Sequence, residues 1–291
     1  MSGLGDWLEG RAVRLVFNLF RVLPMGAASA LGGAVARTIG PLIGVEKRAR
    51  RNLDLAMPGL DEAQKRRILR RMWDNLGRVI AEYPHLADLR FGTPDSPVTI
   101  EGLEHVERAK ALGRPIIFVS AHYGNWEVGG AAIIRHGMRL VQVYRAANNP
   151  MVENIIRGIR EGMGAVAAPK GPAGARLLLG ALKRGDSVVL LADQKMNDGI
   201  AVPFFGRDAM TAPGVAELAR RFDATLIMAR VQRLEGARFR LVIDPPFDIP
   251  RTGDRNADLL AVMTHVNARI EDWVREDPGQ WFWLHRRWPE S

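Results

Sequence analysis

The chain of 291 residues contains no cysteine. This absence excludes a thiol nucleophile, cysteine-ligated zinc and any disulfide framework. The sequence also lacks zinc-finger spacing, an aromatic RNA-binding signature and a convincing helix-turn-helix, so we do not expect nucleic acid as a partner. It has no internal repeats and no low-complexity linker, and its apolar content of 47% is ordinary for a globular core. The composition therefore indicates a globular protein without cysteine chemistry.

Acidic residues are the minority among the charged ones. The 41 Lys and Arg residues against 32 Asp and Glu residues give a net charge of +9 at pH 7. The surface should therefore attract anionic partners, which include nucleic acid, anionic lipid and acidic proteins. Charge alone does not choose among these three.

The sequence has no uninterrupted apolar run long enough to span a bilayer. The uncharged stretch 22–36 is shorter than the roughly 20 residues that a transmembrane helix needs, and it contains Pro24 and several glycines. Just before it, four polar residues recur at helical spacing among apolar ones, namely Arg11, Arg14, Asn18 and Arg21. Such a helix suits the bilayer interface. We therefore expect residues 1–50 to be a membrane-associating segment that lies on an anionic membrane surface.

Two other interpretations of this N-terminal segment stay open. It can pack on the protein's own core, or residues 22–36 can belong to a signal peptide. Asp6, Glu9 and the long region before the apolar run argue against the signal peptide. The basic cluster 47–51 can contact lipid phosphates or simply form solvated surface.

Strand-like and helix-like segments alternate along the rest of the chain. Asp61 to Gln64 has the pattern of a capping box, and the apolar residues after it follow helical spacing as far as Ile80. Further strands are expected at 97–101, 115–121, 138–145, 164–168, 187–192, 224–233 and 238–244. Further helices are expected at 103–112, 125–136, 150–163, 172–184, 213–222 and 255–276. Alternation of this kind predicts an α/β sandwich with a central, mostly parallel sheet flanked by helices, and we expect one catalytic domain over 51–291.

His122 and Glu127 are the strongest candidates for catalysis. The apolar run 115–119 leads to the histidine, and the carboxylate follows five residues later, where a helix can begin. The carboxyl end of a buried strand faces a crevice in open α/β sheets. There the carboxylate can orient the imidazole so that its other nitrogen accepts a proton. A capped helix start beside a surface histidine is the alternative.

Other polar side chains follow the next expected strands. Arg145 ends one strand, and Asp193 and Gln194 end another, which places all three at the same sheet edge as candidates for binding substrate. Arg157 and Arg160 lie three apart on the expected helix between them and can bind a phosphate or stabilise an oxyanion. Turn residues, a structural Asp and surface arginines are the alternatives.

The segment that contains His122, His-Tyr-Gly-Asn-Trp-Glu, resembles the His-x4-Glu signature of the lysophospholipid-acyltransferase-like superfamily. Its usual form in the bacterial lipid A late acyltransferases, the lauroyl and myristoyl transferases, is His-Phe-Gly-Asn-Trp-Glu. Phospholipid-making relatives usually carry Asn-His-x4-Asp.

Four more stretches resemble motifs of the same family, in the same order, so that the resemblance covers roughly residues 45–288. The stretch 144–150 is similar to Tyr-Arg-Pro-x-x-Asn-Pro, with Ala146 in place of the proline. The Asp-Gln pair follows, and then 201–214 resembles the family's Val-Pro-Phe-Phe-Gly loop and threonine-glycine turn. In that stretch Thr211 is a plausible N-cap for the next helix. The tail 278–288 is similar to Gln-Trp-x-Trp-x-His-Arg-Arg, which favours a structural or substrate-lining role for it.

The resemblance implies a glycerol-3-phosphate acyltransferase-like fold and a direct acyl transfer. In that reaction His122 is the general base and Glu127 orients it. The acyl carrier protein is the implied donor, a lipid A precursor the acceptor, and the cytoplasmic face of the inner membrane the location. No metal or redox cofactor is implied. The residues expected to bind substrate or the oxyanion are Arg160 ahead of Arg157, Asp193, Gln194, Arg145 and Asn125, and those expected to line the acyl pocket are Phe204, Phe205 and Trp126.

Two alternatives to a lipid A acceptor stay open. The same chemistry can act on a lysophospholipid, an aminolipid or a glycosylated phosphoinositide, with acyl-CoA as a possible donor. The second alternative is a membrane-surface binding protein with an inactive form of the fold. The intact pair of His122 and Glu127 argues against it.

Overall fold

The fold centres on a seven-stranded sheet. The structure, a computed structural model, describes residues 3–144, 146–169 and 171–288. The strands of the sheet are β1 (Val98–Glu101), β2 (Ile116–Ser120), β3 (Leu140–Tyr144), β4 (Val166–Pro169), β5 (Ser187–Leu191), β8 (Thr225–Arg233) and β9 (Phe239–Ile243). Their order is β1-β9-β8-β2-β5-β3-β4, and neighbours pair in parallel except for the antiparallel β8 and β9. The prediction of a central, mostly parallel sheet is confirmed.

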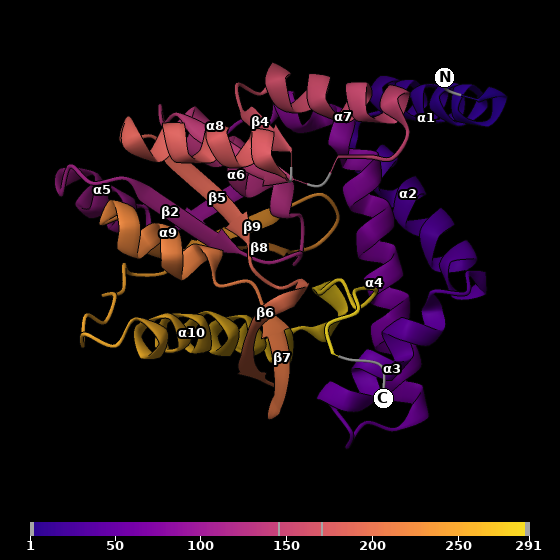
Figure 1. The fold of residues 1–291 in the computed structure, drawn as a ribbon. Helices are drawn as coiled ribbons and strands as arrows, with labels where there is room; N and C mark the ends of the chain where they lie inside the picture. Colours follow the sequence, from indigo (N-terminus) through magenta and orange to yellow (C-terminus); the bar gives the residue numbers. More distant parts are fainter. Residues whose placement is uncertain (1–2, 145, 170, 289–291) are drawn as a thin grey trace.

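Helices flank this sheet and extend it on one side. The α-helices are α1 (Leu4–Val22), α2 (Met25–Ile39), α3 (Glu46–Ala56), α4 (Glu62–Glu82), α5 (Leu103–Ala111), α6 (Trp126–Arg135), α7 (Pro150–Gly162), α8 (Pro172–Lys183), α9 (Gly214–Phe222) and α10 (Arg255–Glu276). Short 3₁₀ turns follow three of them, at η1 (Gly40–Leu42), η2 (Tyr83–Asp88) and η3 (Pro278–Gln280). Figure 1 shows α1 beside α7, while α2 and α4 run down one edge of the molecule. The expected helices and sheet strands are confirmed to within a few residues.

The strands are buried because both faces of the sheet are covered. In β2, Ile117 and Val119 belong to a hydrophobic cluster with residues of α8, α9 and α10. Ile116 and Phe118 alternate with them and belong to a second cluster with residues of α5 and α6. Burial on both faces explains why these strands are continuous apolar runs in the sequence.

The long helix α4 connects the N-terminal helices to the sheet domain. It begins at the predicted capping box, in which Asp61 and Gln64 exchange two hydrogen bonds of 2.8 Å. At its crossing with α2 the two backbones touch through glycines. A Cβ added to Gly32 would lie 2.4 Å from the carbonyl oxygen of Gly77, and one added to Gly77 would lie 2.2 Å from that of Gly32. Only glycine fits at this crossing.

The first helix packs on the α/β domain. The side-chain amide of Asn149, at the start of α7, donates to the backbone oxygen of Asp6 at 2.7 Å and to the Glu9 carboxylate at 2.8 Å. The boundary predicted at residue 50 falls within α3. Among the helices described, no single one is long and apolar enough to cross a membrane, although the bent pair Met25–Leu42 and Glu46–Ala56, at 88°, passes that test by length and composition alone.

A hairpin stands where the sequence suggested a loop. β6 (Lys195–Phe204) and β7 (Arg207–Thr211) pair antiparallel, and the turn between them contains Phe205 and Gly206 with positive φ angles of 53° and 69°.

The expectation that Thr211 caps the next helix is wrong, because Pro213 holds the N-cap position of α9. Thr211 ends β7, and its hydroxyl oxygen accepts a hydrogen bond from the buried Arg287 at 2.9 Å.

Candidate active site

Strand register brings His122 and Asp193 together. β2 and β5 are adjacent and parallel, and Ser120 pairs with Leu191 at their carboxyl ends. His122 and Asp193 each follow two residues later, so the two side chains leave the same sheet edge side by side. At this edge the His122 side chain is partly exposed, at 17%, whereas the Asp193 side chain is buried.

Asp193 is the carboxylate that orients His122. It is fully buried, and its oxygens accept hydrogen bonds from the His122 backbone N–H at 2.9 Å, from His122 Nδ1 at 2.8 Å and from Trp281 Nε1 at 2.9 Å. Burial opposes ionisation of this carboxyl, but the His122 charge and its hydrogen bonds hold the pKa of Asp193 well below its ordinary range. Because a carboxylate only accepts, Nδ1 of His122 carries a proton, and in the neutral form of the ring the lone pair is therefore on Nε2.

Glu127 does not orient His122, so this part of the sequence interpretation is wrong. The residue begins α6 as expected, but its buried carboxylate accepts from Arg160 Nη2 at 2.6 Å, from Gln142 Nε2 at 3.1 Å and from Trp126 Nε1 at 3.2 Å. Its described hydrogen bonds thus go to α7, β3 and α6 itself. The Glu127 side chain is buried, at 3% exposure.

Arg160 is the inward-facing arginine of α7. It is buried, its guanidinium lies 4.7 Å from the Tyr144 ring and 5.9 Å from the Tyr83 ring, and Glu127 raises its pKa in spite of burial. Arg157 instead lies on the exposed side of the helix, where it donates to Asn154 at 2.9 Å. The alignment that favours Arg160 over Arg157 therefore selects the arginine nearer the site interior. Its role in binding an oxyanion or phosphate stays a prediction.

Gln194 and His285 flank Nε2 of His122. The side-chain amide nitrogen of Gln194 lies 3.3 Å from His122 Nε2 and 3.5 Å from His285 Nε2. The two imidazole rings have centroids 4.8 Å apart. Burial and the nearby His122 lower the pKa of His285 to about 3, so this ring is neutral at physiological pH. Sequence analysis gave His285 no role of its own, and only its position in the aromatic-basic tail pointed to it.

The tail that carries His285 runs beside the loop that carries His122. The backbone N–H of Phe282 donates to the His122 carbonyl at 3.0 Å, and that of Gly124 donates to the Gln280 carbonyl at 3.0 Å. From the other side, the buried amide of Asn52 in α3 donates to the backbone carbonyls of Trp283 and His285. The tail therefore packs between this loop and α3, and a substrate-lining role for it stays a prediction.

Asn125 serves the protein interior. Its side-chain oxygen accepts from the Glu127 N–H at 3.3 Å and so caps α6, while its nitrogen donates to Glu82 at 2.7 Å. Glu82 is itself buried and ion-paired with Arg233, and it accepts from Ser29 of α2 at 2.6 Å. Both ends of the Asn125 amide are thus engaged within the fold. The side chain is fully buried, and its predicted substrate contact stays a prediction.

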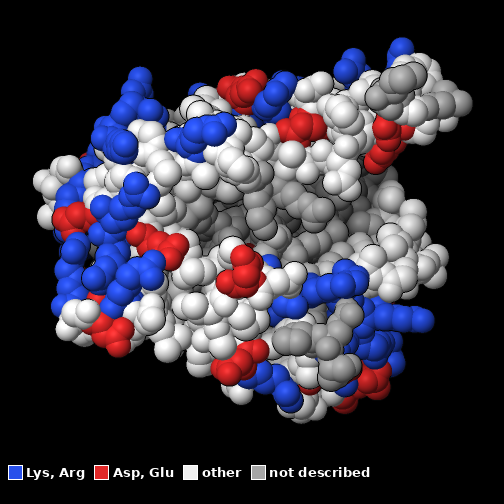
Figure 2. All heavy atoms as spheres, in the orientation of Figure 1, with Lys and Arg blue, Asp and Glu red and all other residues white. Residues whose placement is uncertain are grey.

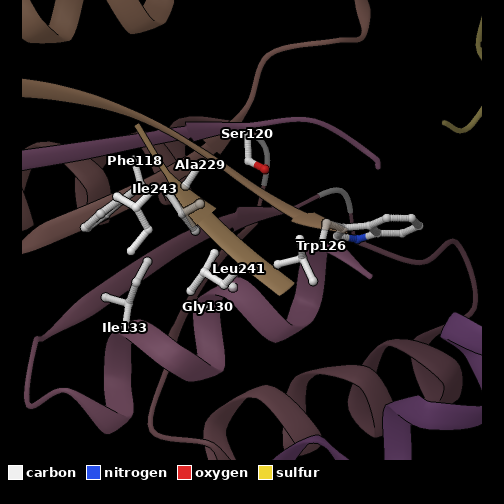
Figure 3. A pocket seen from close by; sticks show the side chains of 11 residues that line it. Phe118, Ser120, Trp126, Gly130, Ile133, Ala229, Leu241 and Ile243 are labelled. Carbon is white, nitrogen blue, oxygen red and sulfur yellow. The ribbon is translucent and has the colours of Figure 1, made fainter. Parts of the chain in front are cut away.

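An apolar cavity opens behind the histidine, between α6 and the sheet. It has a volume of about 20 Å³. Trp126 belongs to its lining (Figure 3), and its ring centroid lies 5.1 Å from that of His122. Phe204 and Phe205 do not line it. They are buried in an aromatic cluster with Trp281, Trp283 and Trp288 under the tail.

The arrangement also offers a metal-type set of ligands. Ligand atoms of His122, Asp193 and His285 lie within 4.8 Å of one another. Both oxygens of Asp193 already accept hydrogen bonds, so a cation would have to compete with these. The expectation of no metal therefore stays a prediction.

The face in Figure 2 is hollowed near its centre, with mostly uncharged atoms around the hollow and Lys and Arg gathered toward two of its margins. Arg145, which was expected to contact substrate, lies outside the described residues.

Comparison with known proteins gives a consistent set of relatives. The family described as bacterial lipid A biosynthesis acyltransferase matches residues 4–290. The chain is 27% identical over 263 residues to the lipid A biosynthesis palmitoleoyltransferase of Escherichia coli (strain K12), covering 88% of this chain and 81% of that protein. It is 27% identical over 254 residues to the lipid A biosynthesis lauroyltransferase of the same strain, with coverages of 83% and 78%. The phosphatidylinositol mannoside acyltransferase of Mycobacterium tuberculosis (strain ATCC 25618 / H37Rv) is 26% identical over 195 residues, with coverages of 65% and 59%.

Proposed function

Since the chain belongs to the bacterial lipid A biosynthesis acyltransferase family and is an O-acyltransferase, we propose that it moves a fatty acyl group from acyl carrier protein to a hydroxyl of a lipid A precursor. One observation carries the mechanism. The oriented pair of His122 and Asp193 lies at adjacent strand ends, next to an apolar cavity.

His122 acts as the general base. Its Nε2 takes the proton of the acceptor hydroxyl while that oxygen attacks the carbonyl carbon of the thioester. Asp193 fixes the tautomer through Nδ1 and stabilises the imidazolium that forms. The tetrahedral intermediate then collapses, the carbon–sulfur bond breaks, and the imidazolium returns its proton to the departing thiolate. The step forms one ester bond and needs no acyl-enzyme.

Gln194 and His285 stabilise the oxyanion of that intermediate. Both present nitrogens near the point where the reacting oxygen meets His122 Nε2. Because the pKa of His285 is lowered to about 3, its ring is neutral near pH 7 and carries one N–H. That N–H can donate a hydrogen bond to the oxyanion.

Two surface properties support acyl carrier protein as the donor and a membrane as the location. These are the positive net charge and the apolar side chains exposed on the N-terminal helices. A net charge of +9 favours an acidic carrier protein and a phosphorylated lipid. Large apolar side chains are exposed along α1 and at η1, among them Leu15 at 71%, Val22 at 78% and Leu42 at 83%. With Arg11 and Arg14 on the same helix, these residues suit peripheral contact with the cytoplasmic face of the inner membrane. Sedimentation with anionic vesicles tests this, and Leu15→Glu with Val22→Glu should weaken it.

A phosphatidylinositol mannoside acceptor is the second candidate. It is favoured by the similarity to the mycobacterial acyltransferase, which covers a smaller share of this chain than the lipid A enzymes do. The same His122 chemistry would serve its hydroxyl.

The test is transfer of a radiolabelled acyl group from acyl carrier protein to a tetra-acylated lipid A precursor in detergent. His122→Ala should reduce turnover by about 10²–10⁴-fold, the usual contribution of a general base. His105→Ala, on α5, is the matched control and should retain wild-type turnover. A folded wild type that acylates mannosylated phosphoinositide but not the lipid A precursor would replace the acceptor, and one that acylates neither, with either acyl carrier protein or acyl-CoA as donor, would overturn the proposed reaction.

A further inference from the structure

Two histidine nitrogens of the candidate site lie beside the same amide group. The amide nitrogen of Gln194 is 3.3 Å from Nε2 of His122 and 3.5 Å from Nε2 of His285. A neutral imidazole has one ring nitrogen with a free lone pair, and a side-chain amide has two N–H groups. With the lone pair on both Nε2 atoms, one amide therefore binds both rings. A cation that takes nitrogen ligands can bind both rings in the same way.

The spacing of the two rings also fits a shared metal ion. Their centroids are 4.8 Å apart and their planes meet at 69°. A zinc ion binds imidazole nitrogens at about 2.0–2.1 Å in a tetrahedral arrangement, which places two ring centroids roughly 5 Å apart. Ligand atoms of His122, Asp193 and His285 lie within 4.8 Å of one another. The two rings therefore need little movement to bind one ion.

Asp193 already gives His122 the partner that metal-binding histidines have. Such a histidine almost always donates its other ring N–H to a carboxylate, a backbone carbonyl or water, which fixes the ring and makes the ligating nitrogen more basic. Nδ1 of His122 donates to the buried carboxylate of Asp193 at 2.8 Å. The negative charge of Asp193 also offsets part of the charge of a divalent cation beside the ring. His122 is thus oriented as a metal ligand by the same bond that orients it as a base.

The remaining ligands are one fixed ring and one side chain that can turn. The backbone carbonyl of His285 accepts a hydrogen bond from the buried amide of Asn52, which holds this part of the tail against α3. Gln194 is exposed and both rings are partly exposed, which gives an ion in solution access to them. A half-turn of the Gln194 amide presents its oxygen as a third ligand, and water can take the fourth position.

We propose that His122, His285 and Gln194 form a binding site for a divalent transition metal such as Zn²⁺, and that the bound ion inhibits the enzyme. Imidazole nitrogen suits zinc, copper and nickel, whereas magnesium and calcium prefer oxygen ligands. The ion takes the lone pair of His122 Nε2 that the general base needs, and no covalent bond is made or broken. The binding site follows from the geometry alone, while the inhibition rests on the proposed acyl transfer.

The first experiment measures Zn²⁺ binding to the metal-free full chain in detergent by titration calorimetry, with Co²⁺ as a second probe whose visible absorption reports the ligand geometry. Asp193→Asn should weaken Zn²⁺ binding by about 10–100-fold, the usual effect of losing the hydrogen-bond partner of a ligand. His285→Asn removes a ligand itself and should weaken it further. His105→Ala is the matched control, because this partly exposed histidine also lies near a carboxylate, that of Glu104 at 3.8 Å, and should keep the wild-type affinity.

A gain of affinity tests the site without disturbing the buried residues. Gln194→Glu changes an exposed side chain and completes a set of two histidines and one glutamate, which several zinc enzymes use, so it should bind Zn²⁺ about 10-fold more tightly or better. Unchanged Zn²⁺ affinity in both Gln194→Glu and folded His285→Asn would overturn the site.

The second experiment measures acyl transfer with added Zn²⁺, as a fraction of the rate of the same protein in EDTA. Wild type should lose activity over the Zn²⁺ range in which the site fills, EDTA should restore it, and Gln194→Glu should be inhibited at lower Zn²⁺. Full activity at saturating Zn²⁺ would overturn the inhibitory role. A wild type that transfers no acyl group in EDTA would contradict the proposed function instead, and the binding data would still decide the metal site.

Discussion

Asp193 and Glu127 are two buried carboxylates close to one histidine, and they have opposite partners. Asp193 binds the imidazole of His122 and the indole of Trp281. Glu127 binds the guanidinium of Arg160 and the amide of Gln142. Glu127 is five residues from the histidine in sequence and Asp193 is 71, yet the distant one orients the ring. Strand register, not sequence spacing, decides which carboxylate meets the imidazole of His122.

The two carboxylates consequently affect different properties. In the proposed reaction Asp193 faces a group that changes charge, so its removal should alter proton transfer. Glu127 neutralises a permanent cation between α6 and α7, so its removal alters the packing of the two helices.

Among the variants of the two carboxylates, we expect Asp193→Asn to have the largest effect on the acyl-transfer rate. An amide can present its N–H to Nδ1 and so stabilise the wrong tautomer, and in a serine protease triad the equivalent change lowers kcat by about 10⁴-fold. We expect a loss of that order with an intact fold. Initial acyl-transfer rates and circular dichroism measure the two properties, and turnover within a few-fold of wild type would show that another group orients His122.

Glu127→Gln should act on stability. Breaking a buried ion pair typically costs about 3–5 kcal/mol because the remaining charge is left uncompensated. The double variant Glu127→Gln with Arg160→Gln should recover part of that loss. Urea unfolding of the single and double variants measures the coupling, and additive losses would argue that the pair does not join α6 to α7. A pH–rate profile that shifts in Asp193→Asn but not in Glu127→Gln would sharpen the distinction.

Acid stability should depend on the groups around Asp193. The pKa of His285 falls from 6.5 to about 3 on folding, so the unfolded state binds the extra proton and stability falls as the pH drops from about 6.5 toward 3. The lowered pKa of Asp193 stabilises the fold above its ordinary value of 3.8, and this contribution is lost as the pH falls below it. Melting temperatures of the wild type and His285→Asn across this range test the first part. Parallel curves would contradict it.

The smallest expected effects come from the secondary donors of each carboxylate. Trp281→Phe removes one hydrogen bond from Asp193, and Gln142→Met removes one from Glu127. A hydrogen bond to a charged group contributes about 1.5–3 kcal/mol. We expect both variants to lose stability of this order but only Trp281→Phe to lower kcat. Equal kcat values for the two, measured below their melting temperatures, would remove the distinction between the carboxylates.

Local patterns predicted most of the fold. The sheet strands and the flanking helices have strong apolar periodicity, and the capping box at Asp61 sits where its spacing placed it. The hairpin of β6 and β7 escaped notice because Gly199, Pro203 and Gly206 interrupt its alternation and a register irregularity divides β6. The helix α3 escaped because its charges were taken for a basic surface cluster.

In the candidate site, only the residues that directly follow a buried strand could be predicted from the sequence. His122, Asp193 and Gln194 follow buried strands, and the structure brings them together. His285 could not be placed in the same way, because backbone pairing between the tail and the loop at His122 brings it there. The same limit applies to Phe204 and Phe205, which looked suited to an acyl chain and instead pack under that tail.

The pairing of the tail with the loop at His122 ties catalytic competence to the order of synthesis. A nascent chain that has reached residue 276 already contains every strand of the sheet, together with His122, Asp193 and Gln194. It still lacks the indole that binds Asp193 and the backbone that pairs with His122 and Gly124. The carboxyl edge of the sheet therefore keeps unpaired polar groups until residues 280–285 leave the ribosome and reach Asn52.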